Sequence, residues 1–422
     1  MKDYNNIIKK FLYTFGMILI YRIGSFISIP GVDYSLILDN NNDQGILGFL
    51  NIFSGGSLNR ISIFSLTIIP YITASIIMQM LSFTYPSIKE LNKQGEIGKR
   101  KINQLIKYLA VFIATFQAYG ISKGLFGKFV VLENKSLFQL FSVMSLVTGT
   151  LSLIWIADRI TLKGIGNGTS IIICTSILSS MPKSVINLFD ISSKGGISPI
   201  ALIIFVLVII LIISLILFVE QSQRKIPIQY PNRNQIIIQQ NKTYFPFKIN
   251  TAGVMPPIFT STILFAPTSI INLFSVKNSF LSFLIGFLTP GKISFIFLFA
   301  FFIVLFSFFY TSNILNLKEI SDNLKKSGSY IFGIRPGKDT LEYLNDISNK
   351  MTVLGSAYLC LICLLPEIII SSLGISLALS GTSILIVINV IMDTIKKIQT
   401  SMIDNNYEAL VSKKIKIRQR MR

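Results

Sequence analysis

The sequence contains no histidine among its 422 residues, and this absence excludes several kinds of chemistry. Imidazole is the usual base of a Ser–His–Asp triad, a common metal ligand and the side chain that titrates near neutral pH. The chain therefore has no His-based triad, no His metal site and no imidazole proton relay.

Cysteine is also scarce, with only three residues in the chain. Cys360 and Cys363 have C-x-x-C spacing, but they lie inside an apolar run with no other soft ligand near them in the sequence. We interpret them, with Cys174, as small apolar side chains rather than as a zinc or redox site.

Charged residues make up only 14% of the chain, whereas 51% of it is hydrophobic. Several apolar runs reach about 20 residues, the length that a helix needs to cross a bilayer. This composition predicts an all-α polytopic membrane protein. Neither a removable signal peptide nor a transit peptide is expected, because no small-residue cleavage site follows the first apolar run.

Hydropathy predicts ten membrane-spanning helices. Most of the 39 Lys and Arg residues then fall on one side, which predicts that both termini lie on the cytoplasm-equivalent side. The spans are expected at residues 11–29, 61–83, 105–121, 137–156, 169–189, 200–219, 252–274, 293–314, 352–373 and 375–392.

The second span follows an unusual break. Residues 46–53 are apolar but too short to cross a membrane, and the sequence SGGS from Ser54 to Ser57 then interrupts them. A broken backbone at membrane depth is tolerated only where it is buried in protein or lines a water-filled cavity. We interpret this stretch as a re-entrant half-helix that faces the protein interior; a loop that only fills space is the alternative.

A short internal similarity indicates two related halves. PYITASII at residues 70–77 resembles PIFTSTIL at residues 257–264, and the two helices would cross the membrane in opposite directions. This pattern is typical of an inverted repeat with a pathway between its halves. The expected division is residues 1–195, residues 196–393 and a basic tail at 394–422.

Two inner loops, at residues 220–251 and 317–351, are longer than a connection requires and rich in Lys and Arg. A polyanionic partner such as ribosomal RNA would suit the first loop, although retention on the inner face explains the same charges.

No constellation for catalysis is evident. GIGNG, from Gly164 to Gly168, looks like a phosphate-binding loop, but its position before a span favours a tight turn. Charges in or near spans are few, namely Arg22, Arg60, Glu367 and Asp393, and no nucleophile–base pair accompanies them. We expect a conduit without cofactor or metal; a secondary transporter with a five-plus-five repeat is the second reading, and an intramembrane enzyme the third.

Nine short motifs follow one another along nearly the whole chain. They are YRIGS from Tyr21, IPG from Ile29, FSGG from Phe53, PYITASII from Pro70, GEIGKRKI from Gly95, GIGNG from Gly164, DNLKKSG from Asp322, GIRPG from Gly333 and GTS from Gly381. Together, in this order, they resemble the SecY family, the pore-forming subunit of the Sec protein translocase.

The resemblance implies a channel with ten helices in two inverted five-helix halves and a re-entrant plug at residues 45–62. The plug residues would be Phe49, Ile52, Phe53, Ser54, Gly55, Gly56 and Arg60. The pore ring would comprise Ile68, Ile72, Thr169, Ile173, Ile258 and Ile386. Thr169 departs from the aliphatic residue usual there, which bears on whether the seal is fully apolar.

The resemblance also implies a lateral gate, an external energy source and partner proteins. Spans two and seven, with three and eight, would form a lateral gate for signal sequences and membrane segments. Energy would come from SecA or the ribosome, and SecE and a SecG-like subunit would complete the channel in membrane lipid. The docking residues for SecA or the ribosome would be Arg224, Lys225, Arg233 and Arg335.

The compartment is predicted from composition alone. Abundant Ile, Asn and Lys, short loops and the lack of a transit peptide resemble a plastid-encoded homologue in the thylakoid membrane. The plasma membrane of an AT-rich bacterium is the alternative.

Overall fold

The structure is a computed structural model that describes residues 2–32, 54–57, 60–125, 134–193, 198–229, 243–274, 292–373 and 380–420. The chain divides into two compact units. The first comprises Met1–Leu188, Ser269–Asn278 and Asn389–Arg422, and the second comprises Phe189–Thr268 and Ser279–Ile388. Whether the units are inverted repeats of each other stays a prediction.

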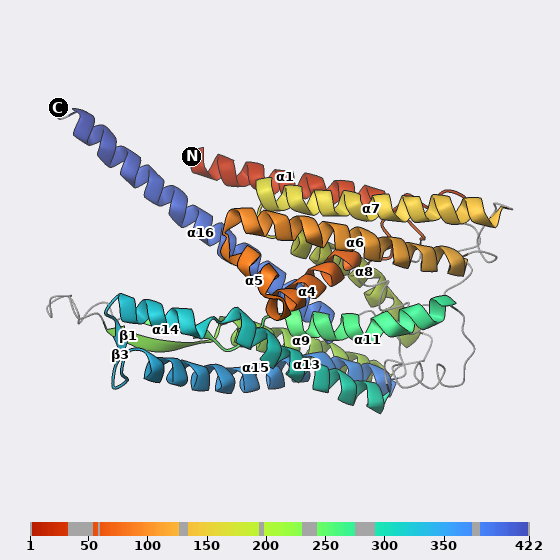
Figure 1. The fold of residues 1–422 in the computed structure, drawn as a ribbon. Helices are drawn as coiled ribbons and strands as arrows, with labels where there is room; N and C mark the ends of the chain where they lie inside the picture. Colours follow the sequence, from red (N-terminus) through yellow and green to blue (C-terminus); the bar gives the residue numbers. More distant parts are fainter. Residues whose placement is uncertain are drawn as a thin grey trace. The chain divides into compact units, whose positions relative to one another are not determined.

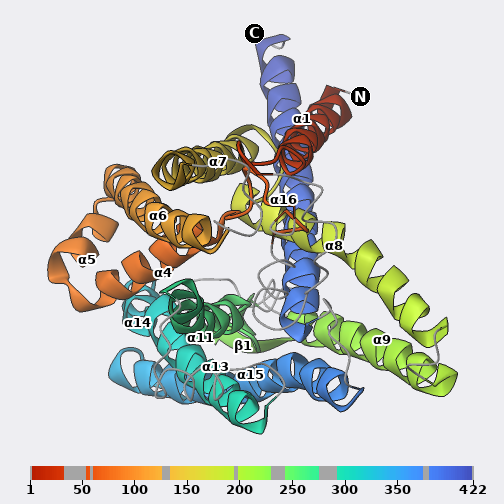
Figure 2. The same ribbon diagram turned by 90° about the vertical axis from the view of Figure 1, so that its right-hand side faces the viewer.

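The first unit contains most of the N-terminal helices. They are α1 (Lys2–Gly24), α4 (Ile69–Thr84), α5 (Pro86–Lys93), α6 (Glu96–Leu125), α7 (Lys135–Lys163) and α8 (Gly168–Ser193), followed much later by the greater part of α16 (Gly381–Arg420). Figure 1 shows α1, α7 and α6 side by side, and Figure 2 shows α4 and α5 beside α6.

Small side chains allow the helices of this unit to approach closely. Ala110, Ala114 and Ala118 recur every fourth residue on α6 and are almost fully buried, and Ala74 on α4 belongs to the same core cluster as Ala110. Spacing of this kind places small residues on one helix face, which is the usual way in which membrane helices pack.

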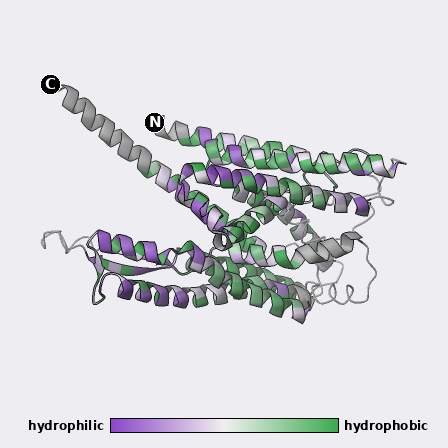
Figure 3. Ribbon diagram, in the orientation of Figure 1, coloured by the Kyte–Doolittle hydropathy of each residue, from purple (hydrophilic) through white to green (hydrophobic). Residues whose placement is uncertain are grey.

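The second unit combines membrane helices with a small polar layer. Its elements are α9 (Pro199–Gln221), β1 (Gln223–Gln229), β2 (Thr243–Lys248), α11 (Met255–Phe274), α13 (Ile293–Ile314), α14 (Leu317–Lys326), β3 (Tyr330–Ile331) and α15 (Lys338–Leu373). Helix α13 packs along α15. Figure 3 shows that α14 and the first part of α15 are hydrophilic, whereas α13 and the later part of α15 are hydrophobic.

The two long inner loops fold together as this polar layer. Strand β1 lies between β2 and β3 in an antiparallel sheet, with Ile226 opposite Phe245 and Ile228 opposite Ile331. The sheet and helices share one core, formed by Ile226, Phe247, Leu317, Ile331, Leu344, Ile347 and Met351. The all-α prediction missed this sheet, because its strands are short and the apolar alternation in β1 and β2 covers only a few residues.

Each of the ten predicted spans overlaps a helix. Within the described residues, six helices are long and apolar enough to cross a membrane, namely α6, α7, α8, α9, α13 and α15, and α4 and α11 contain shorter apolar segments. The predicted span 293–314 has the bounds of α13.

Several boundaries were wrong. The second span was expected from residue 61, but α4 begins at Ile69, because Pro70 occupies its first turn and turns precede it. The ninth was expected from residue 352, but α15 begins at Lys338, since its first turns bury Leu344 and Ile347 against the sheet. The tenth was expected from residue 375, whereas α16 begins at Gly381.

Candidate pore and plug site

The segment that leads into α4 is pinned to the end of α1 by backbone hydrogen bonds. The Ile29 amide donates to the Ile61 carbonyl at 3.0 Å, and the Ile63 amide donates to the Ile27 carbonyl at 2.9 Å. Of the predicted plug residues, Ser54, Gly55, Gly56 and Arg60 are described, whereas Phe49, Ile52 and Phe53 lie outside the described residues. We call residues 54–57 the plug turn.

The plug turn requires glycine for two reasons. Gly55 has φ +62° and Gly56 has φ +81°, a region that L side chains rarely adopt. A Cβ on Gly55 would also lie 2.9 Å from the backbone oxygen of Ser176 in α8. The paired glycines that predicted a break are therefore the residues that let the turn pack directly against α8.

Two arginines converge on this turn. Arg22 Nη1, from α1, donates to the Gly55 carbonyl at 3.3 Å, and Arg60 Nη2 donates to the same oxygen at 3.4 Å. Both guanidinium groups also lie over the ring of Phe26, at 5.1 Å for Arg22 and 4.2 Å for Arg60. The two charges that stood out within the predicted spans thus belong to one site.

Helix α8 supplies contacts that sequence reasoning missed. Ser179 Oγ donates to the Gly55 carbonyl at 3.3 Å, and Ser176 Oγ lies 2.6 Å from the hydroxyl of Tyr21. In the sequence, this face of α8 is marked by two serines spaced three residues apart, Ser176 and Ser179. Hydroxyl groups are too common in membrane helices for this spacing to predict a contact.

The backbone between the plug turn and α4 is strained. Ile61 has φ +47° and Thr67 has φ +52°, and both side chains are β-branched. A branched residue in this region costs about 1–3 kcal/mol and persists only where the surroundings enforce it. The backbone conformation of Ile61 is held by the packing of its side chain in a core cluster that includes Ile29 and Leu66.

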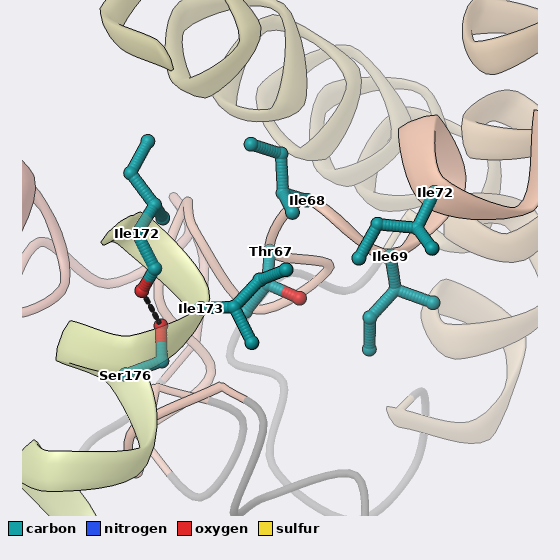
Figure 4. Close-up of a pocket in the computed structure, with 7 residues that line it drawn as sticks. All are labelled: Thr67, Ile68, Ile69, Ile72, Ile172, Ile173 and Ser176. Carbon is teal, nitrogen blue, oxygen red and sulfur yellow. Dashed lines mark hydrogen bonds between the residues drawn. The ribbon is translucent and has the colours of Figure 1, made fainter. Parts of the chain in front are cut away.

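Three of the predicted ring residues meet at a pocket beside this strained segment. Ile68 precedes α4, Ile72 lies on α4 and Ile173 lies on α8 (Figure 4). The pocket is a small hollow, with about 10 Å³ of enclosed space and a side that is open to the surroundings. Its other lining residues are Thr67, Ile69, Ile172 and Ser176, and the Ser176 hydroxyl donates to the Ile172 carbonyl at 2.9 Å.

Thr169 does not line the pocket. Its hydroxyl donates to Asn167 Oδ1 at 2.9 Å, and its backbone amide donates to the same oxygen at 3.3 Å. Asn167 therefore caps the start of α8 and occupies the hydroxyl of Thr169. The hydroxyl group that distinguishes Thr169 from an aliphatic residue is hydrogen-bonded at the start of α8.

The remaining ring residues belong to elements of the second unit. Ile258 is half-buried in the first turn of α11, and Ile386 is 2% exposed near the start of α16. The carbonyl of Ile258 accepts hydrogen bonds from Ser261 and Thr262, so these hydroxyls are satisfied within the helix.

The predicted docking residues lie on the polar layer. Arg224 and Lys225 are exposed on β1, and Arg335 is exposed in the turn between β3 and α15. That turn is built on Gly333 with φ +78° and Gly337 with φ +113°, and the Thr340 hydroxyl donates to the Arg335 carbonyl. Arg233 lies outside the described residues.

The Gly164–Gly168 segment is the tight turn that its position predicted. Gly166 has φ +89°, and a Cβ on Gly168 would lie 1.9 Å from the Ala157 carbonyl oxygen. Its glycines serve close packing between α7 and α8.

Comparison with known proteins agrees with this architecture. The SecY family profile matches residues 62–395. The protein translocase subunit SecY of Rickettsia typhi is 45% identical, over 99% of this chain and 98% of that protein. A solved protein-conducting channel has a TM-score of 0.68 at 16% identity, covering 94% of this chain and 93% of that chain. Canine Sec61, from a ribosome–channel complex of the endoplasmic reticulum, has a TM-score of 0.65 at 16% identity, with coverage of 94% and 93%. By the family profile and the identity to its bacterial relative, the chain belongs to the SecY family.

Proposed function

We propose that the chain is the central subunit of a protein-conducting channel. It passes unfolded preproteins across a membrane and releases transmembrane segments sideways into lipid. Membership of the SecY family supports this function, because the Rickettsia typhi relative is a protein translocase subunit and is similar over its whole length.

The observation that carries the proposal is the apolar pocket beside the plug turn. Ile68, Ile72 and Ile173 reach it from two elements, and the turn packs on the same helix that bears Ile173. Such side chains can fit around an extended polypeptide and exclude ions by dewetting when nothing passes. Ile258, Ile386 and Thr169 complete the proposed ring.

The channel itself performs no bond chemistry in this proposal. Energy comes from SecA or from elongation by the ribosome, and Arg224, Lys225, Arg233 and Arg335 dock these partners. The ribosome complex of canine Sec61 supports the ribosome as one of them. SecE and a SecG-like subunit would complete the channel.

The membrane is proposed to be of bacterial type. The composition that led to a thylakoid prediction is shared by AT-rich bacteria, and the 45% identity to a Rickettsia protein supports the bacterial alternative. Fractionation of the source cells with an antibody against the C-terminal tail distinguishes the two membranes.

Transport into proteoliposomes tests the function. The chain, reconstituted with its SecE-like subunit and supplied with SecA and ATP, should protect a preprotein from added protease. A preprotein without its signal sequence is the control. Equal degradation of both, with the channel folded and inserted, would contradict the proposal.

A further inference from the structure

We propose that Arg22 and Ser179 form a latch on the Gly55 carbonyl, which holds the plug turn against backbone strain stored between that turn and α4. This inference rests on the proposed function and adds how the closed state is regulated. The latch and the strain act in opposite directions, so variants at the two places change channel opening with opposite sign.

Arg22 forms the first half of the latch. A guanidinium group within a membrane span is costly, and such residues are rare unless they act on something. Here the charge is directed at a backbone oxygen of the plug turn, at 3.3 Å, and at the ring of Phe26. Arg22 belongs to α1, so its hydrogen bond ties the turn to a scaffold helix rather than to itself.

Ser179 forms the second half of the latch. Its hydroxyl reaches the same Gly55 oxygen from α8, at 3.3 Å. Arg60 Nη2 also donates to this oxygen, at 3.4 Å, but it belongs to the segment that follows the turn. Arg22 and Ser179 are the donors that come from helices, so α1 and α8 hold the turn at one atom. Gly55 allows this because its missing Cβ lets the backbone lie against Ser176.

Backbone strain next to the plug turn opposes the latch. Thr67 and Ile61 both have positive φ, and both lie between the plug turn and α4. Strain of this kind persists only while the surroundings enforce it. The Ser57 carbonyl of the plug turn accepts hydrogen bonds from the Ser62 amide at 3.0 Å and from the Ser65 hydroxyl at 2.9 Å, so movement of the turn away from α8 removes contacts that hold this segment. The strain therefore favours the open state, whereas the latch favours the closed one.

A purely structural role for Arg22 makes a different prediction. If the residue only helped α1 to fold, its loss would lower the thermal stability of the channel without a selective effect on the plug turn. The measurement must therefore report on the turn directly, and on stability separately.

Accessibility of a cysteine in the plug turn provides that measurement. Ser57 is fully buried, so Ser57→Cys, in full-length channel with Cys174, Cys360 and Cys363 replaced by alanine, should react slowly with a soluble maleimide. Arg22→Gln should raise the labelling rate about tenfold, the effect of losing one charge-assisted hydrogen bond. Arg22→Lys, which keeps a charged donor, should restore part of the protection.

A neighbouring serine supplies the matched control for Ser179. Ser180 Oγ donates to the Ile177 carbonyl within its own helix, at 2.8 Å. Ser179→Ala should raise the labelling rate several-fold, as expected for one neutral hydrogen bond. Ser180→Ala should leave the rate unchanged.

Thr67 tests the opposing strain. Glycine adopts positive φ without cost, so Thr67→Gly should slow labelling and reduce transport of a preprotein with a defective signal sequence. Thr67→Val keeps the branched Cβ and separates loss of the hydroxyl from relief of strain. Arg22→Gln should increase transport of the same defective preprotein.

The outcomes are distinguishable. Unchanged labelling in Arg22→Gln and Ser179→Ala, or faster labelling in Thr67→Gly than in Thr67→Val, would overturn the latch, even where the wild-type channel transports preprotein normally. Failure of the wild-type channel to transport any preprotein would instead contradict the proposed function, since the labelling assay does not depend on transport.

Discussion

The hydroxyl of Tyr21 lies 2.6 Å from Ser176 Oγ, and this buried hydrogen bond joins α1 to α8 next to the plug turn. Tyr21 is 0% exposed and its ring stacks on Phe64 at a centroid distance of 6.0 Å. Gly24 makes room for Phe64, because a Cβ there would lie 2.1 Å from that ring. A single packed cluster thus sets the position of α1 relative to the backbone that enters α4.

Tyr21→Phe tests the energetic value of that hydrogen bond. Ser176 keeps its bond to the Ile172 carbonyl, so the loss should be about 1 kcal/mol of unfolding free energy. Thermal unfolding in detergent should show a lower midpoint, whereas Tyr119→Phe, at an exposed position, should leave the midpoint unchanged. Equal midpoints for both variants would show that the Tyr21 bond contributes nothing.

Two glycines should respond oppositely to alanine. In Gly168→Ala the new Cβ meets the Ala157 carbonyl at 1.9 Å, so α7 and α8 must separate and the channel should fail to fold or lose several kcal/mol. Gly16 lies in α1 with nothing within 4 Å of an added Cβ, and Gly16→Ala should gain up to about 1 kcal/mol. Yield of folded protein and the unfolding midpoint measure both effects; a well-folded Gly168→Ala channel would contradict the packing.

Two Asn–Glu pairs in the second unit differ in burial, and Asn250 also exchanges hydrogen bonds with the Gly253 backbone. Asn250 Nδ2 donates to Glu220 Oε1 at 2.7 Å in the interior, and Asn316 Nδ2 donates to Glu319 Oε2 at 2.9 Å at the surface. Asn250→Ala should cost about 1.5–3 kcal/mol, because it removes a buried bond to an acidic group. Asn316→Ala should cost less than about 0.5 kcal/mol. Similar unfolding midpoints would show that burial adds nothing to the first pair.

Arg335 should matter for partners rather than for folding. Its side chain is exposed, and the Thr340 hydroxyl holds the turn through the Arg335 backbone, which the substitution retains. Arg335→Ala should leave the unfolding midpoint unchanged and weaken ribosome or SecA binding, measured by co-sedimentation, by at least about tenfold. Lys338→Ala, three positions along on α15, is the charge-matched control. Loss of binding in both variants alike would point to general charge and not to Arg335.

Much of the fold could be predicted because apolar length is a strong signal. All ten spans overlap helices, and the Gly164–Gly168 turn is confirmed by its close contacts. The sheet of β1, β2 and β3 escaped prediction because its strands are short and its core is shared with helices that are distant in the sequence. The predicted start of α4 was wrong because residues 61–68 are mostly apolar and were included in the helix. Their backbone instead forms turns that are hydrogen-bonded to the residues after α1.

The candidate site, like the fold, could be predicted only in part. Ile68, Ile72 and Ile173 were assigned to the ring from the resemblance to the SecY family, and the structure places them at one pocket, although their role in a ring stays a prediction. The convergence of Arg22 and Ser179 on Gly55 could not, since it depends on three separate segments meeting at one carbonyl oxygen. Charge within a span marked Arg22 as notable, but the sequence held no clue to its partner.

Site-specific crosslinking to a half-translocated preprotein tests the central claim most directly. A photoreactive residue at Ile72, Ile173 or Ile258 should crosslink to a stalled chain inside the channel, whereas the same residue at Val206, exposed on α9, should crosslink only to lipid. Crosslinks from all three ring positions and none from Val206 is the predicted result. A stalled chain that never crosslinks to Ile72 or Ile173, while the channel remains folded and the preprotein is inserted, would contradict the account.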